Sequence, residues 1–171
     1  MAYWIRNRWL VALAVGLLGG LFLSGFWPHT PLHAVSTDRV DTFAMATGPV
    51  DADTEAVYFL DFLTGDLRAA AINPRMGKFN AFFQVNVLQA MGIDVSKNPK
   101  FLMITGVSAL RRGAGPQWGS SAVYVAETTT GVVAAFATPW PREMANAVKT
   151  IQAPMRMLDM AKFRTAAVRT E

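Results

Sequence analysis

The sequence predicts an α+β fold in which an N-terminal transmembrane helix precedes a two-layer domain of duplicated β-β-β-α units. Three observations predict this fold: an uncharged apolar run near the N-terminus, two similar segments further along, and helix-like periodicity after each of them. The predicted parts are a cytoplasmic segment (1–8), the transmembrane helix (9–27), a proline-containing stalk (28–40) and the α+β domain (41–171).

The apolar run over 9–27 reads WLVALAVGLLGGLFLSGFW and contains no charged residue. At 1.5 Å per residue it approaches the ~30 Å thickness of the hydrocarbon core of a bilayer. Arg6 and Arg8 precede it, so the positive-inside rule predicts a cytoplasmic N-terminus. We therefore expect a signal-anchor that places the chain in a bacterial-type inner membrane, with its C-terminal domain in the periplasm. A cleaved signal peptide is the alternative, with Leu32-His33-Ala34 as a loose cleavage site.

Small residues recur every four positions within this run, at Ala12, Gly16, Gly20 and Ser24. Such spacing lets a second helix approach the backbone closely. The stripe therefore predicts a helix-packing interface inside the lipid bilayer, with another membrane protein or a second copy of this chain as the partner.

The remainder of the chain contains an internal duplication, with a first repeat over 41–97 and a second over 98–171. The matching segments are FAMATG (43–48) with FLMITG (101–106), at an offset of 58 residues, and AVY (56–58) with AVY (122–124), at an offset of 66. Such a duplication predicts pseudo-twofold symmetry within the domain.

Each repeat predicts strands followed by a helix. The segments ending in Gly48 and Gly106 are apolar runs stopped by a turn, and Thr-Gly at 64–65 and at 130–131 predicts a hairpin turn. Apolar residues with a period near 3.6 then predict helices over 78–91 and 142–152, the latter resuming after Pro154 as far as Phe163. Six antiparallel strands with both helices on one face of the sheet would bury the two apolar sets.

The first hairpin, VYFLDFLTGDLRA, carries Asp61, Thr64, Gly65 and Leu67 in an Asp-x-x-Thr-Gly-x-Leu pattern. It resembles the hairpins of quinoprotein-type and related β-propeller blades over about 15 residues. The second copy has Glu127 in place of the aspartate. A propeller requires at least four blades and this chain has two such hairpins, so no quinone binding or activity is carried over.

Several chemistries are excluded or disfavoured by composition. The chain has no cysteine, which excludes disulfides, thiol catalysis and cysteine-metal sites. No nucleotide-binding, hydrolase or zinc-protease motif is present, and the basic residues are scattered, so we expect no nucleic-acid partner, no cofactor and no enzyme activity. Asp51, Asp53 and Glu55 could form either a calcium site or a solvated turn.

These observations favour an accessory or structural subunit of a membrane-associated assembly, which presents a protein-interaction domain outside the cytoplasm. An insertion in the second repeat supplies a candidate partner loop with Arg111, Arg112 and Trp118. The alternative is a small-ligand-binding or sensory domain with a pocket between the repeats. The candidate lining residues of that pocket are Tyr58, Phe83, Tyr124 and Trp140.

Overall fold

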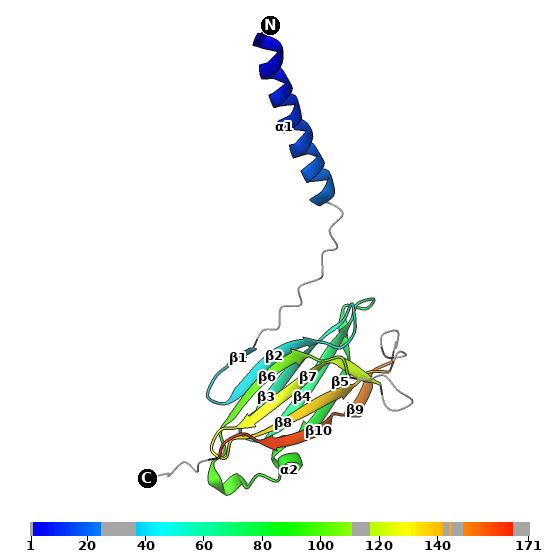
Figure 1. The fold of residues 1–171 in the computed structure, drawn as a ribbon. Helices are drawn as coiled ribbons and strands as arrows, with labels where there is room; N and C mark the ends of the chain where they lie inside the picture. The colour runs from blue at the N-terminus through cyan, green and yellow to red at the C-terminus, as the bar shows by residue number, and fades with distance from the viewer. Residues whose placement is uncertain (1, 25–36, 111–116, 142–143, 145–148, 166–171) are drawn as a thin grey trace. The chain divides into compact units, whose positions relative to one another are not determined.

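In the computed structural model the chain forms two compact units, residues 1–33 and 34–171, which are described separately (Figure 1). The residues that the structure describes are 2–24, 37–110, 117–141, 144 and 149–165, and within 2–24 the side chains are described for 8–20.

The first unit contains one helix, α1 (Ala2–Ser24). Within the described residues, no helix is both long enough and apolar enough to span a membrane. This finding contradicts the predicted transmembrane helix over 9–27, the signal-anchor and the inner-membrane location with a periplasmic domain.

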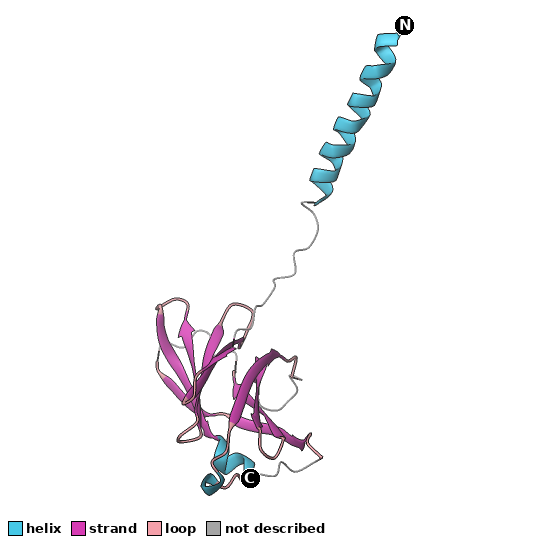
Figure 2. Cartoon of the chain, turned by 90° about the vertical axis from the view of Figure 1, so that its left-hand side faces the viewer, coloured by secondary structure: helices cyan, strands magenta, loops and turns pink. Residues whose placement is uncertain are grey.

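The second unit is built almost entirely from strands, which form two facing sheets (Figure 2). All neighbouring strands are antiparallel except β5 and β9, which run parallel. Sheet A has the order β1 (Thr37–Arg39), β2 (Phe43–Pro49), β3 (Glu55–Asp61), β4 (Asp66–Asn73), β5 (Lys78–Asn86) and β9 (Ile151–Pro154). Sheet B has the order β10 (Arg156–Lys162), β8 (Val132–Pro139), β7 (Trp118–Glu127) and β6 (Phe101–Val107).

The predicted α+β domain of β-β-β-α units is therefore wrong. The segment 78–91, predicted as one helix, is strand β5 followed by the short helix α2 (Val87–Met91). Asn86 caps α2 by accepting a hydrogen bond from the Gln89 backbone, and Gly92 ends it in the left-handed conformation. The residues of β5 alternate between the two sides of sheet A from Ala81 to Gln84, and β5 pairs with β4 from end to end apart from a register shift at Asn80. This non-local pairing overrides the helical period.

The second predicted helix is also wrong where the structure describes it. Ile151–Pro154 is β9, which joins sheet A beside β5, and Arg156–Lys162 is β10, which pairs with β8. Residues 142–143 and 145–148 lie outside the described residues. In place of helices on one face of a sheet, the domain has two sheets packed face to face, with α2 and the turn η1 (Val95–Lys97) between β5 and β6.

Two four-stranded meanders replace the predicted units. β2, β3 and β4 correspond in order and pairing to β6, β7 and β8, while β5 and β10 complete the respective meanders. The two Thr-Gly turns match closely. Gly65 and Gly131 both have φ +71°, and each donates its N–H at 2.9 Å to the carbonyl of the residue four earlier, Asp61 or Glu127.

Equivalent strands nevertheless bury opposite faces. Tyr58 on β3 is 0% exposed and faces sheet B, whereas its counterpart Tyr124 on β7 is 36% exposed and lies on the outside. The same reversal holds for Met45, exposed on β2, and Met103, buried on β6. β2 lies against β6, so the two sheets stack front to back, and the predicted pseudo-twofold symmetry is wrong.

Each Thr-Gly turn depends on the glycine that ends it, because this residue has a positive φ, and Gly65 also has no room for a side chain. A Cβ at Gly65 would lie 2.5 Å from two atoms of the Leu88 side chain. Gly77 has a similar φ of +63° but no atom within 4 Å of a Cβ. A comparison of substitutions at Gly65 and Gly77 therefore separates the free-energy cost of the left-handed backbone from the free-energy cost of the close contact with Leu88.

We predict that Gly77→Ala lowers the free energy of unfolding by about 1–2 kcal/mol, since only the left-handed backbone is penalised. Gly65→Ala should cost a further ~1–3 kcal/mol because the methyl group overpacks the core at Leu88. Urea unfolding of the two variants checks this order. Equal losses would show that the Leu88 contact does not constrain the turn.

Candidate functional site

The space between the two sheets is filled by packed side chains with a small buried polar cluster. The hydroxyl of Tyr58 lies 3.1 Å from Ser121 Oγ and accepts a hydrogen bond of 3.4 Å from Thr138 Oγ1. Burial raises the pKa of Tyr58, while the hydrogen bonds to Ser121 and Thr138 act in the opposite direction. The tyrosine therefore remains neutral and links β3 to β7 and β8, as a buried polar group must find partners.

The four residues predicted to line a pocket between the repeats are divided between the core and the outer face of sheet B. Tyr58, Phe83 and Trp140 are buried core residues, while Tyr124 lies on the outer face of sheet B. Trp140 contacts Phe83 with ring centroids 6.2 Å apart and donates its indole N–H to Asp51 Oδ2 at 2.8 Å. This contact ties the turn after β2 to the end of β8.

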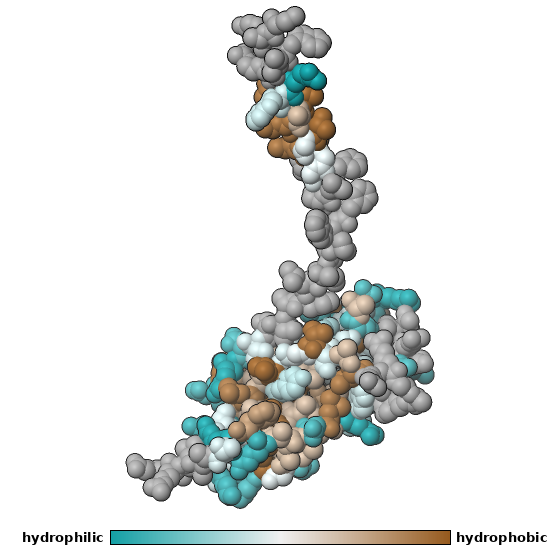
Figure 3. Space-filling model, viewed as in Figure 1, coloured by the Kyte–Doolittle hydropathy of each residue, from teal (hydrophilic) through white to brown (hydrophobic). Residues whose placement is uncertain are grey.

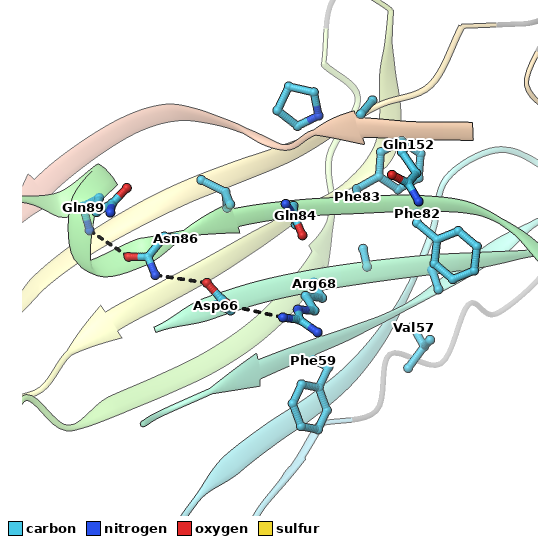
Figure 4. A pocket seen from close by; sticks show the side chains of 15 residues that line it. Val57, Phe59, Asp66, Arg68, Phe82, Phe83, Gln84, Asn86, Gln89 and Gln152 are labelled. Carbon is cyan, nitrogen blue, oxygen red and sulfur yellow. Dashed lines mark hydrogen bonds and ion pairs between the residues drawn. The ribbon is translucent and has the colours of Figure 1, made fainter. Parts of the chain in front are cut away.

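A broad trough lies instead on the outer face of sheet A and has a volume of about 1000 Å³ (Figure 4). Apolar side chains from β3, β4 and β5 make its floor, including Val57, Phe59, Ala70 and Phe82. Phe59 stacks on Phe43 of β2 at 4.8 Å between ring centroids, which extends the apolar surface sideways.

One end of this sheet A trough is polar. Arg68 and Asp66 form an ion pair of 3.2 Å, and Asn86 Nδ2 donates to Asp66 Oδ1 at 3.0 Å (Figure 4). Asn86 is also the cap of α2, through its Oδ1 and the Gln89 N–H at 3.0 Å. These polar groups therefore form hydrogen bonds and an ion pair with one another, and they hold the end of β5 in place. The charges of Arg68 and Asp66 are paired at this end of the trough.

The outer face of sheet B is a second exposed apolar surface. Leu102, Ile104 and Tyr124 project from β6 and β7, and small residues of β8 lie beside them. Figure 3 shows apolar side chains gathered on the face of the β domain in view. An antiparallel sheet in a two-layer domain usually presents a polar outer face to water. Two apolar outer faces on one domain therefore mark candidate binding surfaces.

A smaller cavity of about 200 Å³ lies beside Glu127, next to Ile93 and Lys97. Glu127 is 2% exposed and accepts hydrogen bonds from the backbone of Thr129 (2.8 Å) and from the backbone (2.7 Å) and hydroxyl (2.5 Å) of Thr130. Burial alone would raise the pKa of Glu127, but the hydrogen bonds from Thr130 and Thr129 outweigh it and lower the pKa to about 2. The carboxylate is thus a structural anchor of the β7–β8 turn.

We predict that Glu127→Gln destabilises the domain at pH 7, by about 1–3 kcal/mol, because a charged acceptor of three hydrogen bonds is lost. A lowered pKa stabilises the fold above the unfolded-state value of ~4.3, and that contribution disappears as the pH falls towards 2. The stability difference between wild type and variant should therefore narrow between pH 5 and pH 2. Denaturant unfolding across this range measures it.

Asp61→Asn is the matched control, because Asp61 holds the equivalent turn through Leu63 N (2.8 Å) and Thr64 N (3.3 Å) but is only half-buried. It should cost less at pH 7. A pH-independent loss on Glu127→Gln would contradict the ionised anchor.

The remaining predicted site residues are placed as follows. Ala12, Gly16 and Gly20 are exposed on α1, and Ser24 is its last residue. Arg111 and Arg112 lie outside the described residues, while Trp118 begins β7 and is half-buried against the end of β8.

The acidic cluster after β2 is part of a turn. Asp51 Oδ1 accepts the Asp53 N–H at 3.0 Å, and Asp51 Oδ2 holds Trp140. Among the described residues no group of three or more His, Cys, Asp or Glu could hold a metal ion.

The two apolar faces were missed by the sequence reasoning, although a signal was present. FLMITG and AVYFL are apolar at consecutive positions, a pattern typical of strands with both faces covered. Comparisons with protein-family models, with curated proteins and with solved structures found no match to this chain.

Proposed function

We propose that this chain is a non-enzymatic structural or accessory component whose β domain binds protein through its two outer sheet faces. The observation that carries the proposal is the exposure of large apolar side chains on both faces, among them Met45 and Phe82 on sheet A and Ile104 on sheet B. Exposed apolar patches of this kind are typical of protein-binding surfaces.

The state of the acidic groups supports the same proposal. Asp51, Asp61, Asp94 and Glu127 each accept backbone N–H groups in turns or caps. Their carboxylates are thereby engaged in holding loops in place, which is a structural use of the groups that acid–base chemistry would need.

A photo-crosslinking experiment tests the proposal. Benzoyl-phenylalanine would replace Phe82 on sheet A, Ile104 on sheet B or, as a control, the exposed Lys97 of η1, each in the full chain in its host cells. We expect light-dependent protein adducts at Phe82 or Ile104 and none at Lys97, because only the faces dock a partner. Adducts at neither face would overturn the proposal.

A second candidate function is the binding of a small ligand in the sheet A trough. Its volume and its aromatic floor with a polar end favour this candidate, since ligand sites combine an apolar wall with a few fixed polar groups. Native mass spectrometry of the purified full chain distinguishes it. A retained small molecule that is lost in Phe59→Arg would favour the ligand, and its absence would favour the protein-binding function.

A further inference from the structure

The exposed face of sheet A repeats the buried face of sheet B. Three outward residues of β2 are identical in type to the three inward residues of β6 at the same register positions. These pairs are Phe43 and Phe101, Met45 and Met103, and Thr47 and Thr105. Val57 on β3 likewise matches the buried Val123 on β7. The outer face of sheet A is therefore built like the face that packs inside.

The exposed face of sheet B in turn corresponds in register to the buried face of sheet A. It has the same residue types at one tyrosine and one glycine position, and larger side chains at Leu102 and Ile104, whose counterparts are Ala44 and Ala46. Tyr58 and Tyr124 occupy equivalent places on β3 and β7. In both strands the Cε2 atom of the tyrosine ring lies 3.4 Å from the Cβ position of a glycine on the neighbouring strand, Gly48 or Gly106. One tyrosine–glycine pair is buried against the other sheet, and its copy faces outward.

We propose that copies of this chain stack head to tail, with the outer face of sheet A in one copy packed on the outer face of sheet B in the next. This proposal rests on the proposed function and names a second copy of the chain as the partner. The contact continues the interface that already joins the two sheets, because each exposed face is the counterpart of a buried one. The proposed contact joins two different surfaces, so it is a heterologous interface. Repetition of such an interface produces either a closed ring or an open filament of copies.

The internal contacts specify the contacts between copies. Within the chain, a Cβ at Gly48 would lie 3.1 Å from the Cβ of Ser121, and Ser121 Oγ lies 3.1 Å from the Tyr58 hydroxyl. The residues equivalent to Gly48, Tyr58 and Ser121 are Gly106, Tyr124 and Glu55. Glu55 of one copy should therefore meet Gly106 and the hydroxyl of Tyr124 of the next.

A backbone contact carries over in the same way. Thr105 Oγ1 donates to the Thr47 carbonyl at 2.5 Å across the two sheets. Thr47, its outward counterpart, would donate to the Thr105 carbonyl of the neighbouring copy. The outer face of sheet A departs from the buried face of sheet B at Asp66 and Arg68, whose ion pair of 3.2 Å cancels their charges. It also differs in side-chain size at Phe59 and Ala70, whose counterparts are Val125 and Phe136.

Engineered cysteines test the head-to-tail contact, since the chain has none of its own. Full-length Glu55→Cys and Gly106→Cys would be purified separately and oxidised alone or mixed. A disulfide needs Cβ atoms about 3.5–4.5 Å apart, close to the spacing of the internal counterparts. We expect a disulfide-linked pair in the mixture and at most traces from either variant alone. Lys97→Cys replaces either partner as the exposed control and should give none.

The outcomes separate the proposals. No linked pair in the mixture overturns head-to-tail stacking, and efficient linkage of one variant alone indicates a two-fold contact and overturns it as well. Photo-crosslinks from Phe82 or Ile104 to other proteins only would overturn self-stacking and leave the protein-binding function standing.

The mass of the unmodified chain in solution provides a second readout that does not depend on cysteine. Light scattering should give more than one copy for the wild type and a single copy for Ile104→Arg, which places a charge on the outer face of sheet B. Leu63→Arg, at an exposed apolar residue in the β3–β4 turn, should leave the mass unchanged. A wild-type chain that is a single copy at high concentration would contradict the proposal.

Discussion

The burial of opposite faces by two equivalent meanders is the constraint on which this structure depends. Residues alternate between the faces of a strand, so a sheet whose residues are apolar at consecutive positions has two apolar faces to cover. Here the two sheets stack front to back, which covers one of the two apolar faces of each sheet. One apolar face of each sheet is buried between them, and the other apolar face of each sheet is exposed.

The front-to-back stack is fixed by a few polar contacts that cross between the sheets. The Tyr58 hydroxyl binds Ser121 and Thr138, and the Trp140 indole binds Asp51. A buried hydrogen-bonding group that loses its partner costs more than the bond itself contributes, so these contacts disfavour other ways of packing the same apolar faces. The interior therefore holds the two sheets together, and the two outer faces are the surfaces that we propose for binding.

Part of this fold could be predicted from the sequence. The Thr64-Gly65 and Thr130-Gly131 turns lie between paired strands as the hairpin signals indicate, and Val123 and Val125 share one face of β7 with Tyr124 on the other. These features are local, since turn chemistry and alternation are set within a few residues.

The rest of the fold depends on non-local pairing. Phe79, Phe82 and Phe83 fit a helical period, but pairing with β4 places this segment in a strand, and β10 is held in the same way by β8. The stacking direction could not be read from the duplication, because identical motifs are compatible with two-fold and with front-to-back packing. The stacking direction also decides which apolar faces are exposed. Tyr58 and Tyr124 occupy equivalent positions in the duplication, and the sequence analysis therefore predicted that they line the same pocket.

Thiol labelling at equivalent positions tests the front-to-back stack most directly. Single cysteines would replace Met45, Met103, Ala46 or Ile104, whose side chains are 42%, 2%, 3% and 58% exposed. Labelling is measured at a dilution at which the chain is a single copy, and unfolding curves confirm that each variant is folded. The account predicts fast labelling of Met45→Cys and Ile104→Cys and slow labelling of their counterparts Met103→Cys and Ala46→Cys. Equal rates within each equivalent pair would contradict it.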